Sequence, residues 1–217
     1  SLLHVMRAES PGPQVDKLVP RLQNSAKILY AIYIVLTVVQ AVLLLLGGMP
    51  LFDSVTTAFG TAGTGGFGIK ADSLAGYSHY IQGVCTVFMA LFGINFSVFY
   101  LLLLRQFSRV LHNQELWTYL GVMAAATGII TWNVLPQFGG QVGEALHHAA
   151  FQVSSIMTTT GFATVDFTLW PTLSKTVLVA LMVVGACAGS TGGGIKVARM
   201  LLLSKAGHRG IKRMLRP

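Results

Sequence analysis

The chain contains the same succession of apolar and glycine-rich segments twice. In each copy a long apolar segment is followed by a short one, a Gly-Phe loop and another long apolar segment. The first Gly-Phe loop reads Thr61-Ala62-Gly63-Thr64-Gly65-Gly66-Phe67, and the second reads Thr158-Thr159-Thr160-Gly161-Phe162, 95 residues further on. A chain that enters a membrane, returns halfway on Gly and Thr, and enters again is arranged like the lining of an ion pore.

The composition indicates an integral membrane protein. Only 10% of the 217 residues are charged, against about 25% in soluble domains. The 15 Lys and Arg residues outnumber the 7 Asp and Glu residues, but they gather at the ends of apolar segments, which favours membrane orientation over a nucleic-acid partner. Cys85 and Cys187 lie inside apolar segments without metal-ligand spacing, so we expect free thiols.

We expect a cytoplasmic connector over residues 1–26 and a first repeat over residues 27–112. In that repeat, residues 26–46 and 81–104 are long enough to cross about 30 Å of hydrocarbon as helices. The apolar segment 51–61 is too short to span, and segments of about 10–14 residues are more often re-entrant. The first repeat is therefore predicted to be helix, re-entrant pore helix, helix.

We expect the second repeat over residues 113–205 and a basic cytoplasmic tail over residues 206–217. The segments expected in this repeat are a span at 117–135 that stops at Pro136, a short helix at 143–157, and a last span at 176–188 that resumes at 195–203. The predicted fold class is therefore all-α transmembrane, with two helix–pore helix–helix repeats.

Charged residues predict the orientation of the chain. If both Gly-Phe loops face outside, Lys70 and Lys175 are the only outer basic residues, and the other 13 lie at the inner ends. This is the bias of the positive-inside rule, and it places both ends of the chain in the cytoplasm. The acids expected on the outer side are Asp53, Asp72, Glu144 and Asp166. A cation approaching from outside would meet an acidic mouth.

The two Gly-Phe loops are candidate ion-binding segments. Non-helical backbone persists at membrane depth only when it is buried in protein or lines a water-filled cavity. Carbonyl oxygens can replace the hydration shell of a cation, and Gly allows the positive φ that aims successive carbonyls inward. The alternative is an ordinary loop between two helices. The predicted filter residues are Thr64, Gly65, Gly66, Phe67, Thr158, Thr159, Thr160, Gly161 and Phe162.

The break in the last span is a candidate gate. Five Gly residues between positions 185 and 194 disfavour a helix, at about 1 kcal/mol each. Two other interpretations stay open: a packing surface of small residues, and a phosphate cradle, whose strand–loop–helix context is missing here. The predicted gating residues are Gly189, Ser190, Thr191, Gly192, Gly193, Gly194 and Lys196.

Other polar residues within the apolar segments have simpler interpretations. We expect His147 and His148 to face outward for packing or solvation, because a metal site would need further ligands. Asn95 is expected to hydrogen-bond between helices. The sequence contains no nucleophile–base pair and no paired carboxylates, so we expect no enzyme activity, no cofactor and no structural metal site, with K⁺ at the filter as the only ion.

The chain resembles the membrane subunit of bacterial Trk/Ktr potassium-uptake transporters, with TrkH the nearest type. The likeness covers nearly all of the chain. The stretches that carry it are Arg7 to Pro13, Asp16 to Leu18, Leu51 to Phe67, Ala150 to Phe162, Asp166, Trp170-Pro171, and Gly185-Ala186-Cys187-Ala188-Gly189-Ser190-Thr191-Gly192-Gly193-Gly194-Ile195-Lys196-Val197-Ala198-Arg199.

The resemblance implies four helix–pore helix–helix repeats around one pore in the bacterial inner membrane. Gly66 and Gly161 would be the filter glycines of repeats two and three, and residues 186–194 the gating loop. It also implies a cytoplasmic nucleotide-binding regulatory subunit and a homodimer. Because only two repeats are present, the chain corresponds to the middle half of such a transporter.

Potassium transport is therefore the function that the sequence favours, with membrane lipid and the remaining repeats as partners. Two alternatives stay open. One is a non-conducting structural membrane protein whose repeats have lost the ion role, and the other is a Na⁺/K⁺ symporter of the same fold. The acidic mouth and the intact Gly-Phe loops favour conduction.

Overall fold

The computed structural model describes residues 22–215, and within them the regular secondary structure is entirely helical. The expectation of an all-α membrane protein is confirmed. Most of the connector expected at 1–26 lies outside the described residues, as do the last two residues of the basic tail.

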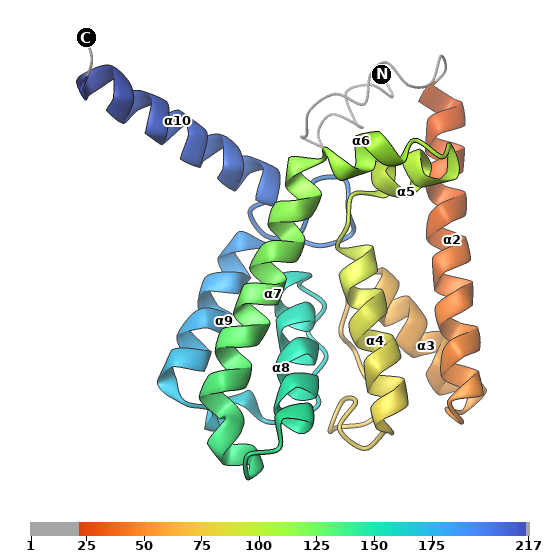
Figure 1. The fold of residues 1–217 in the computed structure, drawn as a ribbon. Helices are drawn as coiled ribbons and strands as arrows, with labels where there is room; N and C mark the ends of the chain where they lie inside the picture. Colours follow the sequence, from red (N-terminus) through yellow and green to blue (C-terminus); the bar gives the residue numbers. More distant parts are fainter. Residues whose placement is uncertain (1–21, 216–217) are drawn as a thin grey trace.

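The first half contains one short helix that packs against the helices before and after it in the chain. They are α2 (Leu22–Leu46), α3 (Leu51–Ala62), α4 (His79–Phe92), α5 (Phe96–Leu103) and α6 (Phe107–Leu111). Figure 1 shows α2 descending along one edge, α3 turning back into the molecule, and α4 returning beside it. The short helix therefore enters and leaves from the same end of the molecule.

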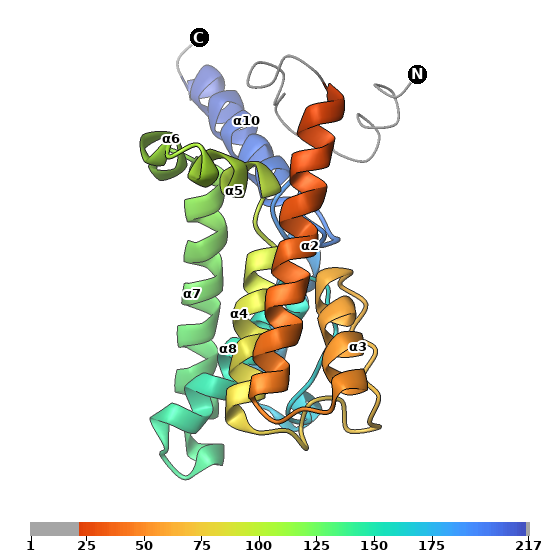
Figure 2. The same ribbon diagram turned by 90° about the vertical axis from the view of Figure 1, so that its right-hand side faces the viewer.

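The second half repeats this course. Its elements are α7 (Gln114–Val134), η1 (Leu135–Phe138), α8 (Val142–Met157), η2 (Phe167–Leu169), α9 (Thr172–Val184) and α10 (Val197–Leu215). In Figure 1, α8 rises from the lower end and stops about halfway, between α7 and α4. The start of α2, the short helices α5 and α6, and α10 all lie at the upper end (Figures 1 and 2).

Two helices within the described residues are long and apolar enough to cross a membrane. They are Ala26–Leu46, with 21 residues and a mean hydropathy of 2.6, and Gln114–Phe138, with 25 residues and a mean hydropathy of 1.3. The second runs past Pro136, because proline near the start of η1 fits a new helical turn. The α-helical part, α7, ends at Val134, close to the stop that we predicted at Pro136, and the 3₁₀ turn η1 continues the segment to Phe138.

The span expected over 81–104 is broken into two helices, which together are apolar enough to count as a third candidate span. Helices α4 and α5 meet at a 90° bend between Phe92 and Phe96. The side chain of Asn95 accepts a hydrogen bond from the Ser97 backbone N–H at 2.9 Å and caps α5. An Asn at this position favours a new helix start over helix continuation. Asn95 is therefore a cap at a bend, where we had expected a bond between two helices.

The two halves pack on each other through α4 and α8. Tyr119 of α7 is fully buried and donates a hydrogen bond of 3.1 Å to the carbonyl oxygen of Ala90 in α4. Phe151 and Phe162 of the second half are fully buried in a cluster formed mainly by residues of the first half. This shared apolar core fixes the position of one Gly-Phe loop relative to the other.

Candidate functional site

The two Gly-Phe loops have matching backbone conformations. The preceding helices end at Ala62 and Met157, which are 95 residues apart. Two residues later, Thr64 and Thr159 adopt positive φ values of 51° and 58°. Such values are uncommon for a β-branched residue and mark a conformation that the surrounding structure imposes.

The hydrogen bonds that close the loops match as well. The carbonyl oxygen of Gly60 accepts from the N–H groups of Gly65 and Gly66 at 2.8 and 3.4 Å. The carbonyl oxygen of Ser155 accepts from Thr160 and Gly161 at the same two distances. Each pore helix thus uses a carbonyl of its last turns to hold the loop that follows it.

The two predicted filter glycines lie against each other. A Cβ atom added to Gly66, at φ 65°, would collide with the carbonyl oxygen of Thr160. A Cβ added to Gly161, at φ 93°, would lie 3.9 Å from the Cα of Gly66. Both positions therefore need glycine, Gly66 for space and both for conformation. The structure brings the two Gly-Phe loops together.

The two phenylalanines of the loops lie in opposite environments. Phe162 is fully buried, and its ring tip would lie 3.1 Å from a Cβ on Gly60 of the first pore helix. Phe67, the residue at the matching position 95 residues earlier, is 86% exposed. Phe162 thus covers α3, the short helix of the first half, whereas Phe67 covers no corresponding short helix within the described residues.

The Gly-rich loop, defined here as residues 185–196, contacts both Gly-Phe loops. The hydroxyl oxygen of Thr159 accepts a hydrogen bond from the Gly193 N–H at 2.7 Å. The hydroxyl of Thr64 donates to the carbonyl oxygen of Thr191 at 3.2 Å. The two threonines that share the unusual φ thus both bind the loop, which joins the candidate filter to the candidate gate.

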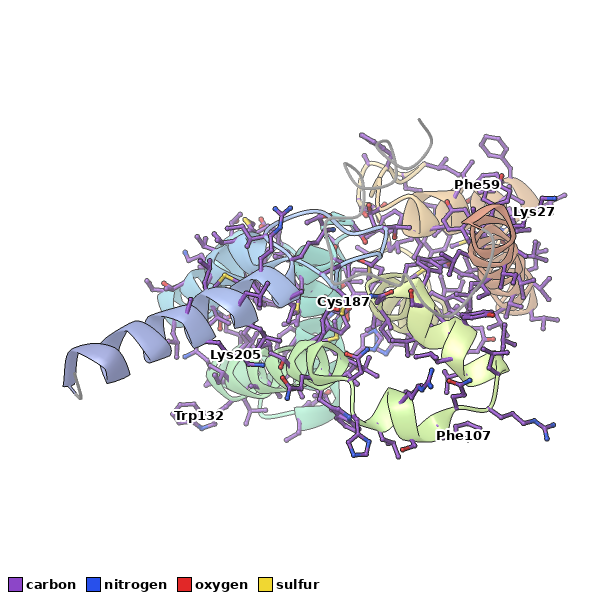
Figure 3. All side chains as sticks on the ribbon, turned by 90° about the horizontal axis from the view of Figure 1, so that it is seen from above. Lys27, Phe59, Phe107, Trp132, Cys187 and Lys205 are labelled. Atoms are coloured by element: carbon purple, nitrogen blue, oxygen red, sulfur yellow. The ribbon has the colours of Figure 1, made fainter. Side chains whose placement is uncertain are left out.

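The same loop occupies the bend between α4 and α5. Cys187 donates its N–H to the carbonyl oxygen of Gly93 at 3.0 Å, and Thr191 donates to that of Phe92 at 3.3 Å. Phe96 donates to the carbonyl oxygen of Gly189 at 3.1 Å. The bend frees backbone groups at the end of α4, and the loop satisfies them. In Figure 3, Cys187 lies between the two halves, whereas Phe59 and Trp132 lie at the periphery.

Two charged residues hold the Gly-rich loop in this conformation. Glu115, in the first turn of α7, accepts a hydrogen bond of 2.6 Å from the Ala188 N–H. The ammonium group of Lys196 donates to the carbonyl oxygen of Gly192. We did not predict Glu115. One feature of the sequence could have identified it. Of the five acidic residues between positions 27 and 205, Glu115 is the one that does not belong to the expected acidic mouth.

Two of the acidic residues in the expected outer mouth form hydrogen bonds with neighbouring residues. Asp53 accepts a hydrogen bond of 2.6 Å from the Tyr77 hydroxyl, and burial together with this bond raises the pKa of Tyr77 to about 12. Hydrogen bonds from the side chain and the backbone of Thr168 lower the pKa of Asp166, which is fully exposed. Asp166 therefore stays charged at neutral pH and can attract cations.

We had expected His147 and His148 to face outward, and the structure shows that they do not both do so. His148 is buried, and its Nδ1 lies 2.9 Å from the hydroxyl oxygen of Thr164. His147 is partly buried, and its Nε2 lies 2.8 Å from Oε1 of Gln82 in α4. The outward-facing interpretation is wrong because α8 packs between α7 and α4.

Comparison with known proteins gives one consistent result. The family model described as "TrkH: Cation transport protein" matches residues 4–131 and 139–217. The chain is 37% identical to the Trk system potassium uptake protein TrkH of Salmonella typhimurium, over 99% of this chain and 45% of that protein. It is 31% identical to the Trk system potassium uptake protein TrkG of Escherichia coli, over 97% of this chain and 44% of that protein.

A solved structure shares the fold. The crystal structure of the potassium transporter TrkH from Vibrio parahaemolyticus matches with a TM-score of 0.85 at 30% sequence identity. The match covers 99% of this chain and 46% of that chain. The chain thus spans about half the length of the proteins it matches.

Proposed function

This chain belongs to the TrkH family of cation transport proteins, and from that premise we propose that it forms half of a gated potassium pore. The other half would come from further repeats, since the matched relatives are about twice as long. The pore would lie in a bacterial inner membrane with the Gly-Phe loops facing outward, in keeping with the distribution of basic residues.

The contact between Gly66 and the Thr160–Gly161 backbone is the observation that carries this proposal. Two loops with matching backbone conformations meet at glycines, at the ends of two short helices. The C-terminal ends of these helices carry partial negative charge, which favours a cation nearby. Backbone carbonyls in such loops can take the place of water around a dehydrated ion. Each loop would provide one quarter of a filter.

We further propose that the Gly-rich loop is a gate. It is joined by hydrogen bonds to Thr64 and Thr159, one from each Gly-Phe loop, so it lies next to the path an ion would take. The conformation is held by a few polar contacts to Glu115, Lys196 and the end of α4. A loop held in this way can be released by a modest change in free energy.

The partners of the complete protein are also part of the proposal. From the family resemblance we expect a cytoplasmic nucleotide-binding regulatory subunit and a homodimer. The basic α10 would be suited to contact a partner on the inner side, because Figure 1 shows it projecting from the body of the molecule.

The test is uptake of radioactive rubidium by cells that lack other potassium-uptake systems and express the complete protein containing this chain. Gly66→Ala and Gly161→Ala should each lower uptake by about tenfold or more, a loss of about 1.4 kcal/mol. The matched control is Gly128→Ala, because a Cβ at Gly128 of α7 meets nothing within 4 Å. Wild-type uptake in both filter variants, at equal protein levels, would show that these glycines do not form a filter.

The same assay separates the alternatives. Uptake that needs external Na⁺ would indicate a symporter, and a complete protein without any rubidium uptake would indicate a structural role. We expect uptake without added Na⁺, and competition by K⁺ stronger than by Na⁺.

A further inference from the structure

Three potential metal ligands from the two halves meet away from the Gly-Phe loops. They are His79, the first residue of α4, and Glu144 and His148 of α8. We propose that these side chains bind a divalent transition-metal ion of the zinc class, and that the ion joins the two halves of the chain. The sequence did not predict this site, because His79 is 65 residues from Glu144. The fold supplies the additional ligand.

The distances suit a metal ion. Nε2 of His79 lies 3.6 Å from Oε2 of Glu144, and Nε2 of His148 lies 3.7 Å from the same oxygen. A tetrahedral zinc ion has ligand distances of about 2.0–2.2 Å, which separates its ligand atoms by roughly 3.3–3.6 Å. All three ligand atoms lie within 4.8 Å of one another. The side chain of His79 is 59% exposed, and its ring stacks on that of His147 at a centroid distance of 4.7 Å, which holds it beside Glu144.

The surroundings of His148 orient its ring for ligation. Its Nδ1 lies 2.9 Å from the hydroxyl of Thr164, and its ring stacks on Phe138 at a centroid distance of 5.3 Å. In the tautomer that donates the Nδ1 proton to Thr164, the free Nε2 lone pair faces Glu144. Histidine ligands in proteins are commonly fixed by such a bond from the other ring nitrogen.

The ligand types decide the class of ion. Two imidazoles and one carboxylate suit zinc, nickel or copper, whereas Mg²⁺ and Ca²⁺ prefer oxygen ligands alone. Glu144 and His148 are four residues apart and lie on one face of α8, so that helix presents two ligands together. Three protein ligands leave a further position for water or another group. His147 is not one of the three, because its Nε2 is engaged with Gln82.

An ion at this position would stabilise the contact between the two halves of the chain. His79 belongs to the first half and the other two ligands to the second, and α4 and α8 are the main contact between the halves. An ion that binds the folded arrangement and not the unfolded chain raises stability by mass action. It would therefore resist separation of the two halves at the proposed outer end. This inference does not depend on which ion the pore transports.

The experiment is titration calorimetry of the complete detergent-solubilised protein with ZnCl₂, alongside thermal unfolding with and without zinc. We expect wild-type protein to bind zinc at this site and to unfold at a higher temperature when zinc is present. His79→Gln should weaken zinc affinity at least about tenfold and abolish most of the thermal shift. His148→Gln and Glu144→Gln should do the same.

The matched control is His112→Gln, which removes an exposed histidine from another part of the chain. Because His79 is exposed, His79→Gln should fold normally, so its titration decides the question even if a buried variant fails to fold. Wild-type protein that does not bind zinc, or equal binding by His79→Gln and His112→Gln, would overturn the proposal. Equal binding of Mg²⁺ and zinc would overturn the assignment of a transition metal.

Discussion

Thr159 accepts a 2.7 Å hydrogen bond from the backbone N–H of Gly193, and this bond joins the second Gly-Phe loop to the Gly-rich loop. Thr159 has a positive φ of 58°, so its conformation is imposed by the contacts around it. Movement of the Gly-rich loop would break this bond and remove one of those constraints. A change in the conformation of the proposed gate therefore directly alters the contacts of the proposed filter.

The first prediction concerns this bond. Thr159→Val keeps the shape of the side chain but removes the acceptor for Gly193. An N–H left without a partner in a partly buried site costs about 1–3 kcal/mol, so the equilibrium between the docked and the released loop should shift about five- to 150-fold toward release. Rubidium flux measured under conditions that close the wild-type pore should rise accordingly.

The matched control for this prediction is Thr118→Val, because the Thr118 hydroxyl bonds only to Gln114 in its own helix and is exposed. Its flux should equal that of wild type. Identical closed-state flux in Thr159→Val and Thr118→Val would argue that the Gly-rich loop does not restrict the pore.

The second prediction concerns Glu115, whose carboxylate accepts a hydrogen bond of 2.6 Å from Ala188. Bonds to a charged group contribute about 1.5–3 kcal/mol. Glu115→Gln keeps an acceptor without the charge, and Glu115→Ala removes the acceptor. We expect closed-state flux to increase from wild type to Gln to Ala, measured by the same rubidium assay. The reverse order, with Ala the least active, would mean that Glu115 holds the loop open.

The repeated pattern was sufficient to predict the two Gly-Phe loops and the interrupted last span, whereas a shared filter was expected only from the family resemblance. Gly66 and Gly161 were recognised by their match to the motifs of the family, and the contact between the two backbones explains why Gly66 must be glycine. The two short helices were predicted from the length of their apolar segments, and their re-entrant course through a membrane stays a prediction. Their role as an ion filter stays a prediction, as does the division of the chain after residue 112.

Long-range contacts were the part that the sequence could not provide. The bend at Asn95 was missed because a single polar residue in an apolar run does not by itself predict a bend. The Gly-rich loop that satisfies the backbone groups at the bend lies nearly a hundred residues later. Glu115 and its partner Ala188 are 73 residues apart, and His79 and its partner Glu144 are 65 residues apart. Such residues show ordinary local patterns, and only the packed fold shows what they bind.

The third prediction uses the contrast between Phe67 and Phe162. Phe162 covers Gly60 of the preceding pore helix, whereas Phe67 is 86% exposed. If the complete protein places another pore helix before residue 22, Phe67 should be covered by it. A cysteine at position 67, in a protein freed of Cys85 and Cys187, should then react slowly with a water-soluble thiol reagent added from outside.

The reference for that measurement is Asp166→Cys, because Asp166 is fully exposed. Labelling at position 67 is expected to be at least about tenfold slower than at position 166, which corresponds to more than 1.4 kcal/mol of protection. Equal rates would contradict a further repeat packed on this side of the first pore helix.

The last prediction is a dependence of stability on pH. The pKa of Tyr77 is raised to about 12 by burial and by the hydrogen bond to Asp53, from an ordinary value of 10.0. A raised pKa means that the folded state holds this proton more tightly than the unfolded state. The stabilisation is therefore complete below pH 10 and is lost as the pH rises from about 10 toward 12.

Tyr77→Phe should cost about 1 kcal/mol near pH 8, after allowance for solvent screening of this partly exposed site. The difference in unfolding temperature between wild type and Tyr77→Phe should shrink above pH 10. Tyr80→Phe, which alters an exposed tyrosine of α4, provides the matched control. A difference that stays constant from pH 8 to pH 11 would show that the Tyr77–Asp53 bond does not contribute to stability.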